Sequence, residues 1–196
     1  MQEREIPLFP LHTVLFPGGI LPLRIFEPRY LDMVSRCLKT GTGFGVCLIS
    51  AGTEAGRAAS VYPLGTLMTI TDWHKREDGL LGITVHGEQR FAVRAQHVES
   101  DQLIRATVEM IANEPYVELP EDYAQLAELL RGAFEQINHP YENVAQKLSD
   151  ASWLSCRLAE LLPLNLDLKQ ELLQMNDPLQ RLARIYACLE KPAADH

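Results

Sequence analysis

The stretch "LFPGGILPLRIFEPRY" at residues 15–30 determines how the first half of this 196-residue chain is expected to fold. It places three prolines and two glycines among large apolar side chains. Pro17-Gly18-Gly19 predicts a turn, and "ILPLRIF" (20–26) predicts a strand. Glu27-Pro28 predicts a helix start, because proline has no N–H to lose at the first helical position. We therefore expect a turn, a strand and a helix in direct succession.

The helix is expected to continue to Lys39 and to close at Gly41. Its apolar residues recur at helical spacing and predict one buried face. That face consists of Tyr30, Leu31, Val34 and Leu38.

Around this helix, the first 115 residues alternate between apolar and polar side chains with a period of two, which is typical of antiparallel strands. Glycines within or beside these runs indicate bulges or sharp bends, as a small closed barrel needs. The glycines are Gly65, Gly82 and Gly87. The expected strands lie within residues 43–50, 63–73, 80–95 and 103–111.

After residue 115 the apolar period changes to 3.6 residues, which predicts helices. Helix starts are expected at Asp167 with Gln170, and at Asp177-Pro178 with Gln180. One apolar stripe consists of Tyr123, Leu126, Leu130, Phe134 and Ile137. A second, ending near Pro163, consists of Leu154, Leu158, Leu161 and Leu162.

The change of period predicts an α+β protein with two lobes. We expect a β-rich lobe over residues 1–115 and a helical bundle over residues 116–196. The stretch "NEPYVELPED" (113–122), with two prolines and four acidic residues, is the expected linker.

Net charge, apolar runs and cysteine spacing disfavour several classes of function. The formal net charge is −8, which disfavours binding to nucleic acid or membrane surfaces through broad basic patches. There is no signal-peptide pattern and no run of about 20 apolar residues that would span a membrane. The cysteines form no CxxC pair, so we expect reduced thiols in a cytoplasmic protein. They are Cys37, Cys47, Cys156 and Cys188.

Motifs for catalysis are absent. The chain contains no GxxxxGK[ST], HExxH or GxSxG, and "GTGFG" (41–45) leads from a helix into a strand, so it predicts a turn and not a dinucleotide site. We therefore expect no catalytic residues, no bound metal and no cofactor, and we interpret His86 and His97 as structural. This pattern favours a binding module over an enzyme.

Four segments, in the same order along the chain, resemble the N-terminal substrate-binding domain of the Lon protease family. "IPLFPLHTVLFPGGILPLRIFEPRY" (6–30) is similar to the start of that domain, and "YPLGTLMTIT" (62–71) to its "GT" strand. "LLGITVHGEQRFAV" (80–93) is similar to its hairpin, and residues 162–185 to its helical segment. The resemblance implies a PUA-like β pseudo-barrel followed by a helical bundle.

In that family this region helps to recognise unfolded substrates, whereas ATP hydrolysis and a Ser–Lys dyad reside in other domains. The resemblance therefore implies a stand-alone member without ATPase or protease domains. We expect a non-catalytic module that binds unfolded or extended polypeptides, as an adaptor in protein quality control. The oligomeric state stays open.

Peptide binding of this kind uses exposed apolar residues in a groove or at an open strand edge. The candidate residues are Phe16, Ile20, Tyr30 and Trp73, with Arg24, Arg29 and Arg90 as polar anchors. The alternative for each residue is that it packs the barrel against its helix.

Two other function classes remain open at this point. PUA-like barrels elsewhere bind RNA, and a basic face around the first helix would suit that function. It would consist of Arg24, Arg29, Arg36 and Lys39. The other class is a hydrolase whose catalytic group carries no recognisable motif.

Overall fold

The structure is a computed structural model that describes residues 3–136, 141 and 144–190. The chain divides into two compact units, a β unit over residues 1–113 and a helical unit over residues 114–196. No helix in the described ranges is long and apolar enough to cross a membrane.

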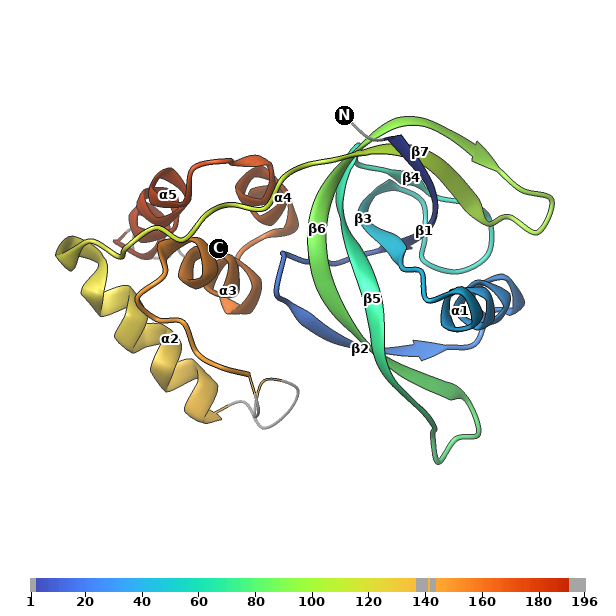
Figure 1. Cartoon of the computed structure of the whole chain (residues 1–196), viewed down its shortest axis with the longest axis horizontal. Helices are drawn as coiled ribbons and strands as arrows, with labels where there is room; N and C mark the ends of the chain where they lie inside the picture. The colour runs from blue at the N-terminus through green and yellow to red at the C-terminus, as the bar shows by residue number, and fades with distance from the viewer. Residues whose placement is uncertain (1–2, 137–140, 142–143, 191–196) are drawn as a thin grey trace, which may run out of the picture. The chain divides into compact units, whose positions relative to one another are not determined.

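The described part of the β unit contains seven strands and the helix α1 (Pro28–Thr40) (Figure 1). The strands are β1 (Glu3–Leu11), β2 (Ile20–Ile25), β3 (Phe44–Ala51), β4 (Ser60–Val61), β5 (Leu64–Lys75), β6 (Leu81–Val98) and β7 (Ile104–Met110). All four strand segments expected from the alternating pattern are therefore present, and β2 and α1 follow the turn as predicted.

Five of the strands close into a barrel. Neighbouring strands follow the order β1-β7-β6-β5-β3, and parallel pairing of β1 with β3 completes the ring, with Leu8 opposite Gly45 and Leu11 opposite Leu48. Closure removes the free edges where the strands pair, whereas residues 69–75 of β5 pair with β6 alone among the described strands. β2 lies outside the ring and pairs with β6, and β4 pairs with β3.

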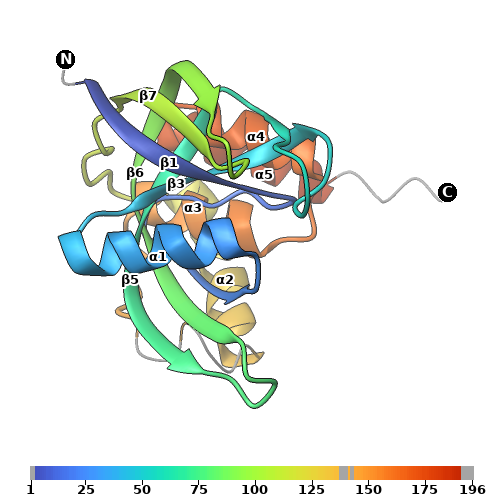
Figure 2. The same cartoon turned by 90° about the vertical axis from the view of Figure 1, so that its right-hand side faces the viewer.

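Helix α1 belongs to the crossover between the parallel strands β1 and β3, and Figure 2 shows it lying against the barrel. It begins at Pro28 and is closed by Gly41, whose φ of 64° is in the left-handed region, as the sequence predicts. The predicted buried face is wrong in part, because Leu31 and Leu38 are exposed. The helix is rotated so that the face against the barrel consists of Tyr30, Met33, Val34 and Cys37.

Both faces of the barrel wall are covered by apolar side chains. One core cluster joins α1 to the barrel through residues such as Phe9, Phe44 and Met68. A second cluster surrounds Phe91 and includes Ile104. Adjacent residues on β1 therefore face different cores, since Leu8 belongs to the Phe91 cluster and Phe9 to the α1 cluster.

The expected glycine bulges are confirmed at one position. The β5–β6 register shifts between Leu67 and Met68, which face Gln89 and Gly87. Gly65 and Gly82 are at no register shift, and close packing explains them instead. A Cβ on Gly65 would lie 2.3 Å from the Val46 carbonyl oxygen, and one on Gly82 would lie 2.7 Å from the His74 ring.

The described part of the helical unit consists of a short 3₁₀ turn and four α-helices (Figure 1). They are η1 (Glu121–Tyr123), α2 (Ala124–Gln136), α3 (Ala151–Leu161), α4 (Leu166–Gln174) and α5 (Pro178–Glu190). The first predicted stripe is confirmed at Leu126, Leu130 and Phe134, whereas Ile137 lies outside the described residues. The predicted α+β architecture, a β pseudo-barrel followed by a helical bundle, is confirmed.

One of the two predicted helix starts in this unit is correct. Asp177 caps α5, because its Oδ1 accepts a hydrogen bond from the Leu179 amide at 2.9 Å. The start predicted at Asp167 is wrong. Asn165 caps α4 by accepting a hydrogen bond from the Leu168 amide at 2.8 Å, which places Asp167 in the first turn of the helix.

The expected linker is bound to the helical unit over much of its length. The Ala151 amide donates to the Val117 carbonyl at 2.7 Å, and the Ser152 hydroxyl donates to the Pro115 carbonyl at 2.7 Å. Glu114 forms an ion pair with Arg181, a buried guanidinium that also donates to the Leu172 carbonyl. Residues 114–117 are therefore part of this unit's packing.

Replacement of Gly65 tests the close approach of β5 to β3. We expect Gly65→Ala to lower the free energy of unfolding by about 1–3 kcal/mol, because the added methyl group meets a backbone carbonyl. Gly132→Ala is the control, since no atom lies within 4 Å of a Cβ added there within α2 and alanine favours a helix. Urea unfolding followed by circular dichroism measures both; equal effects would contradict this packing.

The corrected cap of α4 can be tested in the same assay. We expect Asn165→Ala to cost about 1 kcal/mol of stability and Asn165→Asp to cost much less, because aspartate keeps the acceptor for the Leu168 amide. Equal losses in the two variants would show that the cap contributes nothing.

Candidate functional site

A hollow of about 280 Å³ lies where β2 passes into α1, within the stretch at residues 15–30. We call it the junction hollow. Its lining is mainly apolar, with three charged side chains. It is lined by Phe9, Leu11, Leu23, Arg24, Ile25, Phe26, Glu27, Tyr30 and Glu54.

Two closely packed aromatic rings, tilted by 43° to each other, are part of the lining of this hollow. The rings of Phe9 and Tyr30 have centroids 4.1 Å apart, and Phe9 also packs edge-on against Phe44. Tyr30 is buried, and this burial raises its pKa to about 12; Arg29 opposes the rise, and the carboxylates of Glu27 and Glu54 add to it. The tyrosine is therefore a fixed, neutral wall of the hollow at physiological pH.

Arg29 holds the segments around the hollow together. Its guanidinium donates to the Gln102 carbonyl at 2.8 Å, forms an ion pair with Glu27 at 3.1 Å and lies 4.5 Å from the Tyr30 ring centroid. Glu27 also accepts a hydrogen bond from the Gly56 amide at 3.2 Å. The Arg29–Glu27 ion pair thus links the start of α1, the β6–β7 turn and the 52–58 loop.

Two large aromatic side chains are exposed beside or near the hollow. Phe26 is 50% exposed and Trp73 is 61% exposed. Leu23 faces Ile83, which in turn faces Trp73, so these three side chains form a row on one face of β2, β6 and β5. Arg24 lies 5.8 Å from the Phe26 ring centroid and 3.8 Å from Asp78, which follows β5. Phe26 and the β5–β6 hairpin are therefore neighbours.

The structure gathers some of the predicted binding residues here. Arg24 and Tyr30 line the junction hollow, and Trp73 is exposed on the neighbouring hairpin. Arg29 is 5% exposed and its guanidinium is bound to Gln102 and Glu27, so it supports the site without forming part of its surface.

Three of the predicted residues lie apart from the hollow. Phe16 is buried, and its carbonyl accepts a hydrogen bond from the Gly19 amide in the turn before β2. Ile20 is half-buried and pairs with His86 on β6. Arg90 is buried on β6 opposite Thr66. They are placed to support the barrel.

The four residues considered for RNA binding do not form one continuous basic face. Arg29 is buried and ion-paired, and Arg24 forms an ion pair with Asp78. Arg36 and Lys39 stay exposed on α1. No observation in the described residues favours RNA.

Sequence reasoning missed Phe26, Leu23 and the two carboxylates of the hollow. Phe26 directly precedes the cap residue Glu27, and Leu31 is four positions into the helix, which is the spacing of a hydrophobic staple. That signal predicts a packed residue, whereas half of Phe26 faces solvent. Glu54 comes from a distant loop and carries no local signal.

The described residues contain no group of three or more His, Cys, Asp or Glu side chains placed to hold a metal ion. Burial raises the pKa of the Cys47 thiol to about 12, so this cysteine is not an activated nucleophile at neutral pH. The site thus offers apolar contact and a few charges.

Comparison with known proteins places the chain in a family. Residues 5–191 match the family described as the ATP-dependent protease La (LON) substrate-binding domain. The chain therefore belongs to the Lon substrate-binding domain family. The predicted resemblance is confirmed.

Individual relatives agree with this assignment. A Lon protease of Dictyoglomus thermophilum is 26% identical over 94% of this chain and 25% of its own length. A Lon N-terminal domain protein of Xanthomonas campestris has a crystal structure that matches with 37% identity and a TM-score of 0.77, covering 94% of this chain and 98% of that one. The N-terminal domain of a Mycobacterium avium complex Lon protease shares the fold at 19% identity and a TM-score of 0.63, covering 94% and 97% of the two chains. The chain spans about a quarter of the curated Lon proteases it matches.

The wall of the hollow predicts a pH dependence. Because the folded-state pKa of Tyr30 is raised to about 12 from 10.0, its contribution to stability is complete below pH 10 and is lost as the pH rises towards 12. We expect Tyr30→Phe to remove this alkaline loss and to remove a late-titrating phenol from the absorbance at 295 nm. A variant whose titration and urea unfolding between pH 9 and 12 match those of the parent would contradict the buried position of Tyr30.

Proposed function

We propose that this member of the Lon substrate-binding domain family is a recognition module that binds exposed apolar segments of other polypeptides and performs no chemical step itself. The family description supports this proposal, because it names the matched region for substrate binding in an ATP-dependent protease. We further propose that the chain acts in the cytoplasm as an adaptor for protein quality control.

The observation that carries the proposal is a pair of exposed aromatics: Phe26, which lines the junction hollow, and Trp73, on the neighbouring β5–β6 hairpin. Large aromatic side chains supply much of the contact energy in protein recognition, and neighbouring pockets accept side chains of the partner. Phe26 and Trp73 are half or more exposed, and the hollow between β2 and α1 measures about 280 Å³. That volume suits a single bulky side chain of an extended peptide, near the lower limit of ligand pockets.

The arrangement also explains how the surface stays open. Glu27, itself paired with Arg29, holds the 52–58 loop through the Gly56 amide, and the Tyr30 ring is fixed against Phe9. The exposed aromatics therefore stand on a fixed base, so little side-chain or loop ordering opposes binding.

Alanine variants of the two aromatics test this function. We expect Phe26→Ala and Trp73→Ala each to weaken the binding of a labelled, reduced and carboxymethylated polypeptide by about fivefold or more, as for residues at the centre of an interface. The matched control is Val98→Ala, because Val98 is 51% exposed at the far end of β6.

Fluorescence anisotropy measures the affinities, and circular dichroism checks that each variant is folded. No saturable binding of the parent chain up to about 100 μM, or an equal loss in Val98→Ala, would contradict the proposed site.

A further inference from the structure

A second hollow of the β unit, of about 310 Å³, has a different charge from the first. We call it the arginine hollow. Three arginines, on β1, α1 and β7, are among its lining residues. Its lining residues include Arg4, Arg36 and Arg105, the carboxylate of Glu5, and the apolar side chains of Ile6, Met33 and Leu67.

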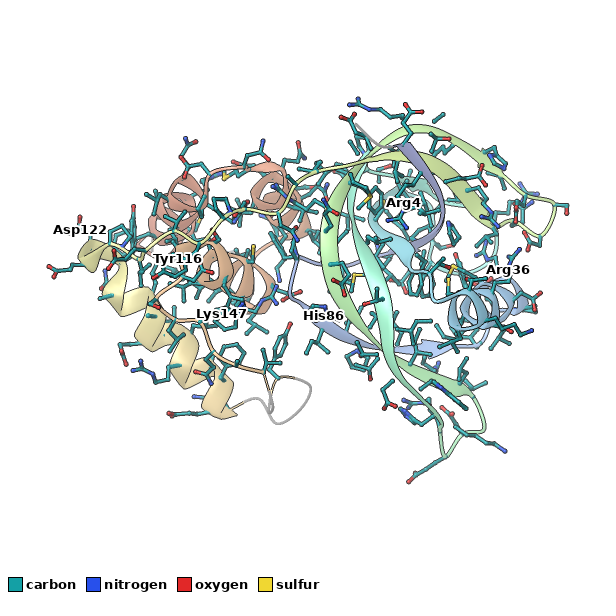
Figure 3. The ribbon with its side chains drawn as sticks, in the orientation of Figure 1. Arg4, Arg36, His86, Tyr116, Asp122 and Lys147 are labelled. Atoms are coloured by element: carbon teal, nitrogen blue, oxygen red, sulfur yellow. The ribbon has the colours of Figure 1, made fainter. Side chains whose placement is uncertain are left out.

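The three arginines come from separate elements, and the strand register places Arg4 and Arg105 on opposite faces of the β1–β7 pair. Arg4 is on β1 opposite Val108 of β7, Arg105 is on β7 opposite Pro7, and Arg36 is on the third turn of α1. Figure 3 labels Arg4 and Arg36 on their separate elements. Barrel closure and the packing of α1 nevertheless bring all three into the lining of one hollow, in a chain whose net charge is −8.

Two of these cations keep their charge available for a ligand. Arg105 is compensated by Glu99 at 3.1 Å and by Glu5 at 3.6 Å. Arg4 and Arg36 form no ion pair within the part of the chain that the structure describes. The lining thus carries three positive charges and one negative charge, whereas the junction hollow has Arg24 against Glu27 and Glu54.

We propose that the arginine hollow binds a carboxylate group of a polypeptide ligand. Guanidinium groups match the geometry of carboxylates and form charge-assisted hydrogen bonds with them. The adjacent apolar residues suit a carboxylate carried on a hydrophobic segment. This inference rests on the proposed function, because it takes the ligand to be a polypeptide, and it adds a preference for acidic segments.

The test uses two labelled peptides of one apolar, aromatic sequence that differ in having glutamate or glutamine at the same positions. We expect the parent chain to bind the glutamate peptide about tenfold more tightly at low salt, and the difference to shrink as salt screens the charges. Each peptide is made with a free and with an amidated C-terminus, which distinguishes a terminal carboxylate from a side-chain carboxylate.

Arg4→Gln and Arg36→Gln should each reduce this preference about threefold and leave the affinity for the amidated glutamine peptide unchanged. Lys39→Gln is the matched control, since Lys39 is exposed on the same helix, carries the same charge and lies outside the hollow. If Lys39→Gln reduces the preference for the glutamate peptide equally, the preference comes from the general positive charge of the surface and not from the hollow, and the inference is overturned.

The two proposals fail in different ways. If the amidated glutamine peptide binds and neither glutamate nor a free C-terminus improves its affinity, the arginine hollow is not a carboxylate site and the recognition function stands. If none of the peptides binds, the recognition function is wrong and this inference falls with it.

Discussion

The buried guanidinium of Arg29 is the interaction on which the candidate site depends. Removing a charge from water is costly, and a buried cation is tolerated when acceptors surround it. Here the Gln102 carbonyl, the Glu27 carboxylate and the face of Tyr30 provide that compensation. These partners belong to separate segments, so the same contacts that stabilise the charge also fix the walls of the junction hollow.

The parallel pairing of β1 with β3 explains why this site is located beside α1. A parallel pair needs a crossover connection, and the crossover here contains the turn at Pro17, strand β2 and helix α1. β2 adds to β6 outside the closed ring, and its end delivers Phe26 to the surface just before the helix begins. The exposed aromatic is thus a consequence of how the barrel is closed.

The sequence predicted the elements well because local signals define them. Pro28 and Gly41 mark the ends of α1, and the period of two marks the strands of the barrel. The burial of side chains was predicted less well, since β1 is covered on both faces and alternation there no longer identifies an exposed side. Phe16, between β1 and β2, and Arg90, on β6, are both buried.

The same limit applied to the site residues. From the sequence, an arginine in the first turn of a helix is expected to be exposed. The burial of Arg29 depends on a hydrogen bond to Gln102, which lies 73 positions away in sequence. Glu54 reaches the hollow from another loop, and the arginine hollow joins three elements. Such sites arise from tertiary contacts, which a single sequence does not encode in any local pattern.

We propose that polypeptides bind at the junction of β2 and α1. The most direct measurement is a set of ¹H–¹⁵N NMR spectra of the labelled chain, recorded while an unfolded, carboxymethylated polypeptide is added. We expect backbone signals of residues 23–30 and of the Trp73 region to shift or broaden first and saturably. Perturbations confined to other surfaces, such as the β6–β7 turn or the helical unit, would contradict it.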